Sequence, residues 1–212
     1  MSGTSQVRFW SGMLFVLLLG IALPVKAATT IGGKHVYIIY PGVDSIWGSY
    51  IFVVNNTGVQ PEQLVFPVML PKETVDFQAQ DTLSPQEIKL GADGGVTIDK
   101  NFATGETLIQ VSFKIPASQG TSMATLKAPY PYDSIGVFVW QDSFKVNGPE
   151  GVVVQKGVNL SGRNFDTYFA GAGAAGQTVL FTFDGIPEGR GRLWVFGGIF
   201  AGLLLVTGLS IA

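Results

Sequence analysis

The stretch Thr107–Ile115, TLIQVSFKI, decides the fold class of this sequence. Its odd-numbered positions are apolar after the first residue, whereas its even-numbered positions hold Leu108 and three polar residues. An alternation with a period of two predicts a β-strand that has one face in a core and the other mostly in water. The turn residues Thr104-Gly105-Glu106 lead directly into this strand.

Similar segments lie on both sides of this strand. We predict strands at 35–40, 47–55, 64–70, 74–80, 88–90 and 96–98, and then at 123–128, 135–140, 144–146, 152–155, 164–169 and 177–183. Asp93-Gly94 and Asn147-Gly148 are signals for tight hairpin turns. No stretch between residues 30 and 185 has a 3.6-residue apolar period. The pattern therefore predicts an all-β protein, an antiparallel β-sandwich of one or two Ig-like or regulatory-like units.

Small polar residues at 116–122, PASQGTS, form the clearest internal boundary in this strand-rich region. We favour two packed units over two parts of one sandwich. The predicted organisation is a signal peptide at 1–27, a first sandwich unit at 28–118, a second at 119–186, a tether at 187–192 and a transmembrane helix at 193–212.

The amino-terminal residues have the three parts of a secretory signal. Arg8 provides a basic region, residues 10–23 are apolar apart from Ser11, and small residues lead to a predicted cleavage after Ala27. The alternative is an uncleaved anchor, although fourteen residues are few for a membrane span. In either case the residues after Ala27 are predicted to be outside the cytoplasm.

The carboxy-terminal run at 193–212, LWVFGGIFAGLLLVTGLSIA, contains no charged residue. A helix of this length is about 30 Å long, which matches the hydrocarbon core of a bilayer. We therefore predict a single-pass anchor in membrane lipid. Gly198 and Gly202 form a GxxxG spacing that suits close helix packing, although glycine is common in membrane helices.

The residue types argue against several functional classes. The sequence has no cysteine, which excludes disulfides, thiolate metal sites and a cysteine nucleophile. Its single histidine, His35, has no nucleophile motif beside it, and the carboxylates have no diagnostic spacing. A net charge of −2 without a basic cluster argues against nucleic-acid binding. We predict no enzymatic activity, no metal and no cofactor.

Four aromatic residues that lie close together in the sequence are candidates for a binding surface: Tyr130, Tyr132, Trp140 and Phe144. If exposed, their rings would suit stacking on sugars or contact with a protein. The alternative is that Trp140 and Phe138 fill a sandwich core.

Several short motifs occur in a characteristic order: Asn55-Asn56-Thr57, Leu70-Pro71, Thr104-Gly105-Glu106-Thr107 and Pro129-Tyr130-Pro131. Together with the two terminal segments, this order resembles uncharacterised bacterial exported proteins that have carboxypeptidase-regulatory-like β-sandwich domains and a carboxy-terminal membrane helix. The resemblance covers residues 45–212. It implies an envelope location and a sandwich without catalytic residues.

These features predict a membrane-anchored extracytoplasmic β-sandwich, periplasmic or at the cell surface, that serves as a non-catalytic binding or accessory component of a cell-envelope assembly. Its expected partners are membrane lipid and an envelope protein. Two alternatives stay open. One is a carbohydrate-binding or carbohydrate-active surface protein, and the other is a structural protein that assembles through its strands or its helix.

Overall fold

A computed structural model describes residues 28–91, 95–160 and 162–189. The predicted signal peptide and the predicted transmembrane helix, with Gly198 and Gly202, lie outside these residues. All regular secondary structure in the described part of the chain is β-strand, which confirms the all-β prediction. Among these residues there is no helix with the length and apolar character needed to cross a bilayer.

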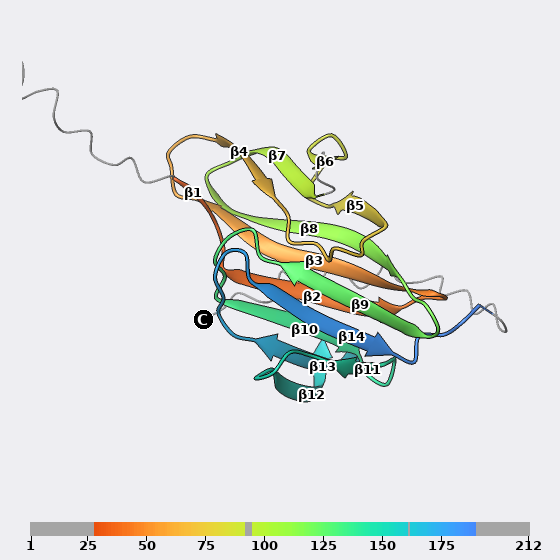
Figure 1. Cartoon of the computed structure of the whole chain (residues 1–212). Coiled ribbons are helices and arrows are strands. Elements are labelled where there is room, and N and C mark those ends of the chain that lie inside the picture. Colours follow the sequence, from red (N-terminus) through yellow and green to blue (C-terminus); the bar gives the residue numbers. More distant parts are fainter. Residues whose placement is uncertain (1–27, 92–94, 161, 190–212) are drawn as a thin grey trace, which may run out of the picture.

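The described chain forms strands β1 to β14 (Figure 1). Their bounds are β1 Thr29–Ile31, β2 Lys34–Pro41, β3 Ser45–Asn56, β4 Glu62–Pro67, β5 Asp76–Gln80, β6 Ile88–Leu90, β7 Val96–Phe102, β8 Gly105–Pro116, β9 Thr121–Lys127, β10 Ser134–Trp140, β11 Lys145–Asn147, β12 Val153–Leu160, β13 Arg163–Ala170 and β14 Thr178–Asp184.

One layer is an eight-stranded sheet in the order β12-β13-β10-β2-β3-β8-β5, with β1 paired to the end of β3. Its neighbouring strands are antiparallel except for β2 and β10, which are parallel. A parallel pair needs a long crossover connection, and here strands β3 to β9 supply it. The antiparallel prediction is therefore correct for the sheets in general and wrong for this pair.

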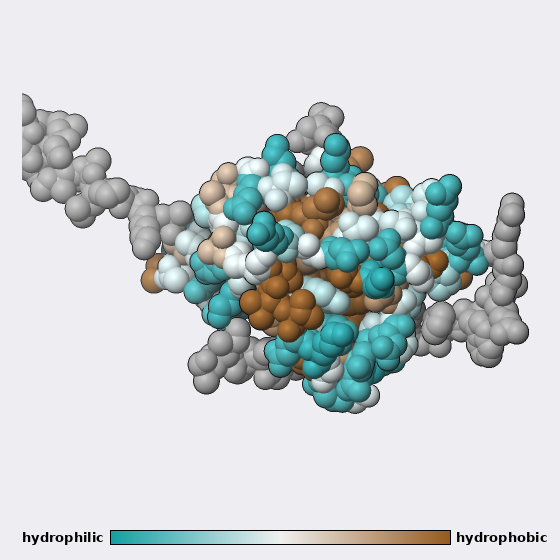
Figure 2. All heavy atoms as spheres, turned by 60° about the horizontal axis from the view of Figure 1, so that its bottom comes forward, coloured by the Kyte–Doolittle hydropathy of each residue, from teal (hydrophilic) through white to brown (hydrophobic). Residues whose placement is uncertain are grey.

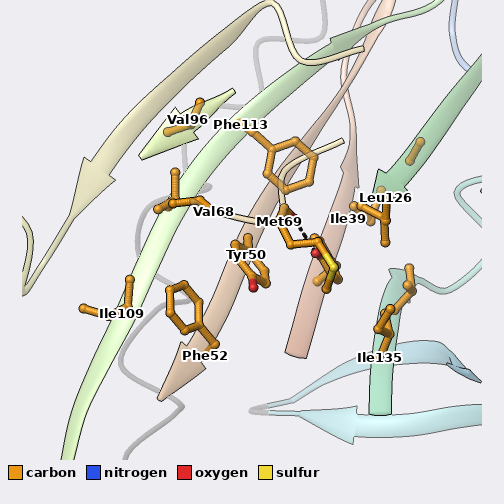
Figure 3. Close-up of a cluster of buried hydrophobic side chains, with 14 of the residues drawn as sticks. Ile39, Tyr50, Phe52, Val68, Met69, Val96, Ile109, Phe113, Leu126 and Ile135 are labelled. Atoms are coloured by element: carbon orange, nitrogen blue, oxygen red, sulfur yellow. Dashed lines mark hydrogen bonds between the residues drawn. The ribbon is translucent and has the colours of Figure 1, made fainter. Parts of the chain in front are cut away.

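Two three-stranded sheets, β11-β14-β9 and β4-β7-β6, form the second layer. Both pack on the same face of the large sheet, because their inward side chains join one hydrophobic core with β2, β3, β8 and β10. Figure 3 shows this core between the layers, with Phe113 and Tyr50 facing Met69. The Tyr37 hydroxyl donates a hydrogen bond to the Met69 carbonyl and so ties the layers together.

The expected units 28–118 and 119–186 are not separate sandwiches. Strands β10, β12 and β13 come from the second range, yet they lie in the same sheet as β2 and β3 from the first. Side chains from both ranges share the core. The loop at 116–122 reads as a boundary because it is polar, but it only turns the chain from one layer to the other. The described residues therefore fit one sandwich.

Strand β8 confirms the predicted alternation on its apolar side, where Ile109, Val111, Phe113 and Ile115 are at most 1% exposed. The prediction for the other side is only partly right. Gln110 is 1% exposed, and its amide donates a weak hydrogen bond of 3.5 Å to the Ser49 hydroxyl on β3. A strand in the middle of a large sheet has neighbours on both sides, which shield even polar positions from water.

One strand was not predicted, and one local prediction is wrong. The predicted strands begin at residue 35, but Thr29–Ile31 already pair with the end of β3. Asn147-Gly148 reads as a hairpin turn, but β11 pairs with β14 and β12 pairs with β13. Short segments carry little periodic signal, and their partners are set by strands far away in the sequence.

Candidate functional site

The four aromatic residues predicted as one binding surface lie in three different places. Tyr132 is only 4% exposed and bridges to Gly173. Tyr130 is half-buried, with its ring centroid 5.8 Å from that of His35. Phe144 packs edge-on against Phe183 of β14 at 5.8 Å. Only Trp140 lies on the face of the large sheet turned away from the core, so these four residues do not line a common sugar-binding groove.

His35 belongs to an internal aromatic cluster and not to a surface site. It is 1% exposed, and its Nδ1 lies 2.6 Å from the Tyr50 hydroxyl. Tyr50 in turn stacks on Tyr37 at 4.7 Å and on Phe52 at 4.9 Å. Burial lowers the pKa of His35 to about 4, although the Asp133 carboxylate opposes the shift. The imidazole is therefore neutral at pH 7.

A different group of aromatic residues comes together on the outer face of the large sheet. Tyr40 lies directly opposite Trp47, and Trp140 directly opposite Phe165. The parallel pairing ends at Val139 with Ile39, so Trp140 and Tyr40 are the next residues along. Residues at matching positions on neighbouring strands point to the same face. We call these four residues, Phe165, Trp140, Tyr40 and Trp47, the aromatic row.

Two cations lie over rings of the aromatic row. Lys114 Nζ is 5.1 Å from the centroid of Trp47, and the Arg163 guanidinium is 5.3 Å from that of Trp140. Cation–π contacts of this kind contribute about 0.5–1 kcal/mol at exposed sites. Tyr40 stands edge-on to Phe165 at 6.4 Å. Burial raises the pKa of Tyr40, while the Arg163 charge opposes the shift.

The aromatic row lies on the side opposite to the main core. Along β2, Tyr37 and Ile39 enter the core, so Val36, Ile38 and Tyr40 face outward. Trp47 is 38% exposed. Phe165 is buried, yet it is not part of the main core cluster. The outer face of the large sheet is thus apolar in its middle strands and has aromatic rings at one end.

The described chain ends beside this row. The Gly189 amide donates a 3.0 Å hydrogen bond to the Asp44 carboxylate, and the Asp44 amide donates one of 2.9 Å to the Pro187 carbonyl. Asp44 lies in the turn between β2 and β3, with φ at 51°. Trp47 follows it by three residues, or about 10 Å along a strand. We call this end of the sandwich the exit end.

Apolar surface is not confined to the aromatic row. Met123 and Leu180 are 49% and 44% exposed on the outer side of the sheet β11-β14-β9. On the side of the molecule drawn in Figure 2, hydrophobic residues gather centrally and hydrophilic residues surround them. Exposure alone therefore does not single out the row. The row is distinguished by three features: its four rings are in register, two cations lie over them, and it lies at the exit end.

Sequence reasoning identified Trp140 but missed Tyr40, Trp47, Phe165 and the cations above the rings. The row joins the consecutive strands β2 and β3 to β10 and β13, which come about a hundred residues later in the chain. The alternation within each strand was a usable signal, because it assigns Tyr40 to the face opposite Ile39. Which strands are neighbours was not readable from the sequence.

In the described residues, no group of three or more His, Asp and Glu side chains is placed to hold a metal ion. No protein-family model matches the sequence, and no curated protein matches it. The resemblance to regulatory-like domains therefore stays a prediction.

Solved structures give distant similarities. The M1 zinc metallopeptidase from Deinococcus radiodurans is 10% identical with a TM-score of 0.42, and the match covers 74% of this chain and 42% of that one. A mutant of that enzyme bound to a Tyr-Ser-Ala substrate matches at 10% identity and a TM-score of 0.41, with the same coverage. The chain spans less than half of these proteins. At such values the likeness says nothing about activity or substrate.

Proposed function

We propose that this protein is a membrane-anchored extracytoplasmic β-sandwich that acts as a non-catalytic binding or accessory component of a cell-envelope assembly. The apolar runs at both ends of the sequence support the location. The all-β sandwich supports a binding role, since sandwiches are common in proteins that act through surface contacts. The enclosed position of His35 fits a structural role and offers no exposed general base.

The observation that carries the proposal is the way in which the chain leaves the sandwich. Residues 185–187 are held by backbone hydrogen bonds to Gly120 and Asp44, and Gly189 is held by the Asp44 side chain. Residues 190–192 then separate this fixed point from the apolar run at 193–212. Four extended residue steps reach about 14 Å at most. A bilayer anchor at 193–212 would thus hold the exit end close to the membrane surface.

The location is tested in cells with the full-length protein carrying a single cysteine. Because the sequence lacks cysteine, Val65→Cys introduces a unique thiol at a position that is 62% exposed on β4. We expect the protein to stay in the membrane fraction after carbonate washing. We also expect a membrane-impermeant maleimide to label it in intact spheroplasts. Labelling only after lysis would place the sandwich in the cytoplasm and contradict the proposal.

We propose that the chain is cleaved after Ala27, as the small residues before that position indicate. The Ala28 carbonyl accepts a 2.8 Å hydrogen bond from the Thr57 amide, at the end of β3 away from Asp44. β3 has 12 residues and so spans roughly 36 Å. The two apolar runs thus attach at opposite ends of the sandwich. If the amino-terminal run is removed, the sandwich is attached to the membrane at its exit end alone.

Mass spectrometry of the purified protein checks this prediction. We expect a mature chain that begins at Ala28. A chain that retains residues 1–27 would mean that the sandwich lies along the membrane between two attachment points, which contradicts cleavage but not anchoring.

A further inference from the structure

We propose that the aromatic row contacts the lipid interface of the membrane that holds the carboxy-terminal anchor. This inference rests on the proposed anchoring and adds the orientation of the sandwich. The outer face of the large sheet would contact the bilayer in the part that lies at the exit end of the sandwich. The β4-β7-β6 sheet and the far end of β3 would point away from it and stay available to an envelope partner.

The first step is distance. The row lies about 10 Å from Asp44 along β3, and Asp44 holds Gly189. The start of the apolar run lies at most about 14 Å from Gly189. A headgroup region several ångströms thick lies at each side of a bilayer core. The aromatic row is therefore within reach of the headgroups without any change in the sandwich.

The second step is chemistry. Trp and Tyr are enriched at membrane–water interfaces, where the ring meets apolar atoms and the polar group meets water. Lys and Arg side chains lay their aliphatic parts on apolar surface and keep their charges in water. The row combines these features in Trp47, Tyr40 and Trp140, with Lys114 and Arg163 over the indole rings. Val43, in the turn of the exit end, adds an apolar side chain that is 47% exposed.

The third step concerns charge. Lys114 and Arg163 share the exit end with the exposed carboxylates Asp44, Asp142 and Glu188. Asp76 lies directly opposite Lys114 on the edge strand β5. The carboxylates outnumber these two cations, so attraction to anionic lipid does not drive the contact. Burial of Trp47 and Val43, the exposed apolar side chains of the exit end, in the headgroup region drives it, and we expect the contact in neutral phosphatidylcholine as well.

Spin labelling of the full chain in phosphatidylcholine vesicles tests the proposal. Val43→Cys places a label at the exit end, and Val65→Cys places a matched label on the outer side of β4. Both valines are exposed in the sandwich, at 47% and 62%. We expect a water-soluble nickel chelate to collide several-fold less with the label at position 43 than with that at position 65. Adding anionic lipid should leave this ratio unchanged.

Vesicle flotation separates the two proposals. A chain that does not float with the vesicles overturns the anchoring and, with it, the lipid contact. A chain that floats but has equal nickel accessibility at both labels overturns the lipid contact and leaves the anchoring in place. As a second variant, Trp47→Ala in the Val43→Cys protein should raise nickel accessibility at position 43 while flotation persists. No rise would show that the row does not hold this end on the bilayer.

Discussion

Gly48→Ala is expected to lower the free energy of unfolding by about 3 kcal/mol, at the upper end for an overpacked core. A Cβ at position 48 would lie 2.2–2.7 Å from three ring carbons of Phe113 on the neighbouring strand β8. The ring cannot move aside easily, because Phe113 is 1% exposed and stands edge-on to Tyr37 at 6.3 Å. Denaturant unfolding of the detergent-solubilised full chain, followed by near-ultraviolet circular dichroism, measures the change.

A double-mutant cycle shows whether this single contact is responsible. Phe113→Leu replaces the ring with a smaller aliphatic side chain that lacks the clashing atoms, so Gly48→Ala should cost clearly less in that background than in the native protein. Gly171→Ala is the matched control, since nothing lies within 4 Å of the added Cβ. We expect that control to change stability by less than about 0.5 kcal/mol. Additive effects of Gly48→Ala and Phe113→Leu would contradict the packing argument.

The second large effect is a loss of stability in mild acid through His35. Its folded-state pKa is about 4, whereas the ordinary value for histidine is 6.5. At pH values well above 6.5 the ring is neutral in both states and the full stability is present. As the pH falls from 6.5 toward 4, the unfolded chain gains a proton that the folded chain does not bind. The free energy of unfolding should drop by about 2 kcal/mol at pH 5 and about 3 kcal/mol at pH 4.

His35→Phe isolates this contribution. The substituted ring cannot titrate, and a flat ring suits the surrounding Tyr50, Phe52 and Tyr130. The Tyr50 hydroxyl loses its partner, which lowers stability at every pH without adding a slope. We expect the variant to have a flat stability profile between pH 7 and pH 5, measured by denaturant unfolding at each pH. A variant that keeps the native slope would assign the acid sensitivity to other groups.

The two faces of the large sheet differ in what they contact. The inner face packs into the one shared core, whereas the outer face carries aromatic rings and cations that are not part of that core. Val65 and the rest of the β4-β7-β6 sheet lie in the other layer. In an anchored protein this arrangement would separate the membrane side from the side that meets a partner.

The alternation of apolar and polar residues is enough to locate the strands. Period-two alternation, as in Thr107–Ile115, can be read within a single segment. It shows which side of the strand faces the core, whichever strands are its neighbours. Most of the predicted strands agree closely with the observed ones, and the all-β class follows from them. The predicted signal segment and membrane helix rest on the sequence alone.

Which strands are neighbours depends on the whole fold. The parallel pairing of β2 with β10 joins the two expected units into one sheet, and it places Tyr40 beside Trp140. It also brings Tyr130 and Tyr132 against His35, where Tyr132 is buried and Tyr130 is half-buried. Strand pairing is set by the burial of all inward side chains at once. No single segment carries that information, so the aromatic row could not be found before its strands were placed.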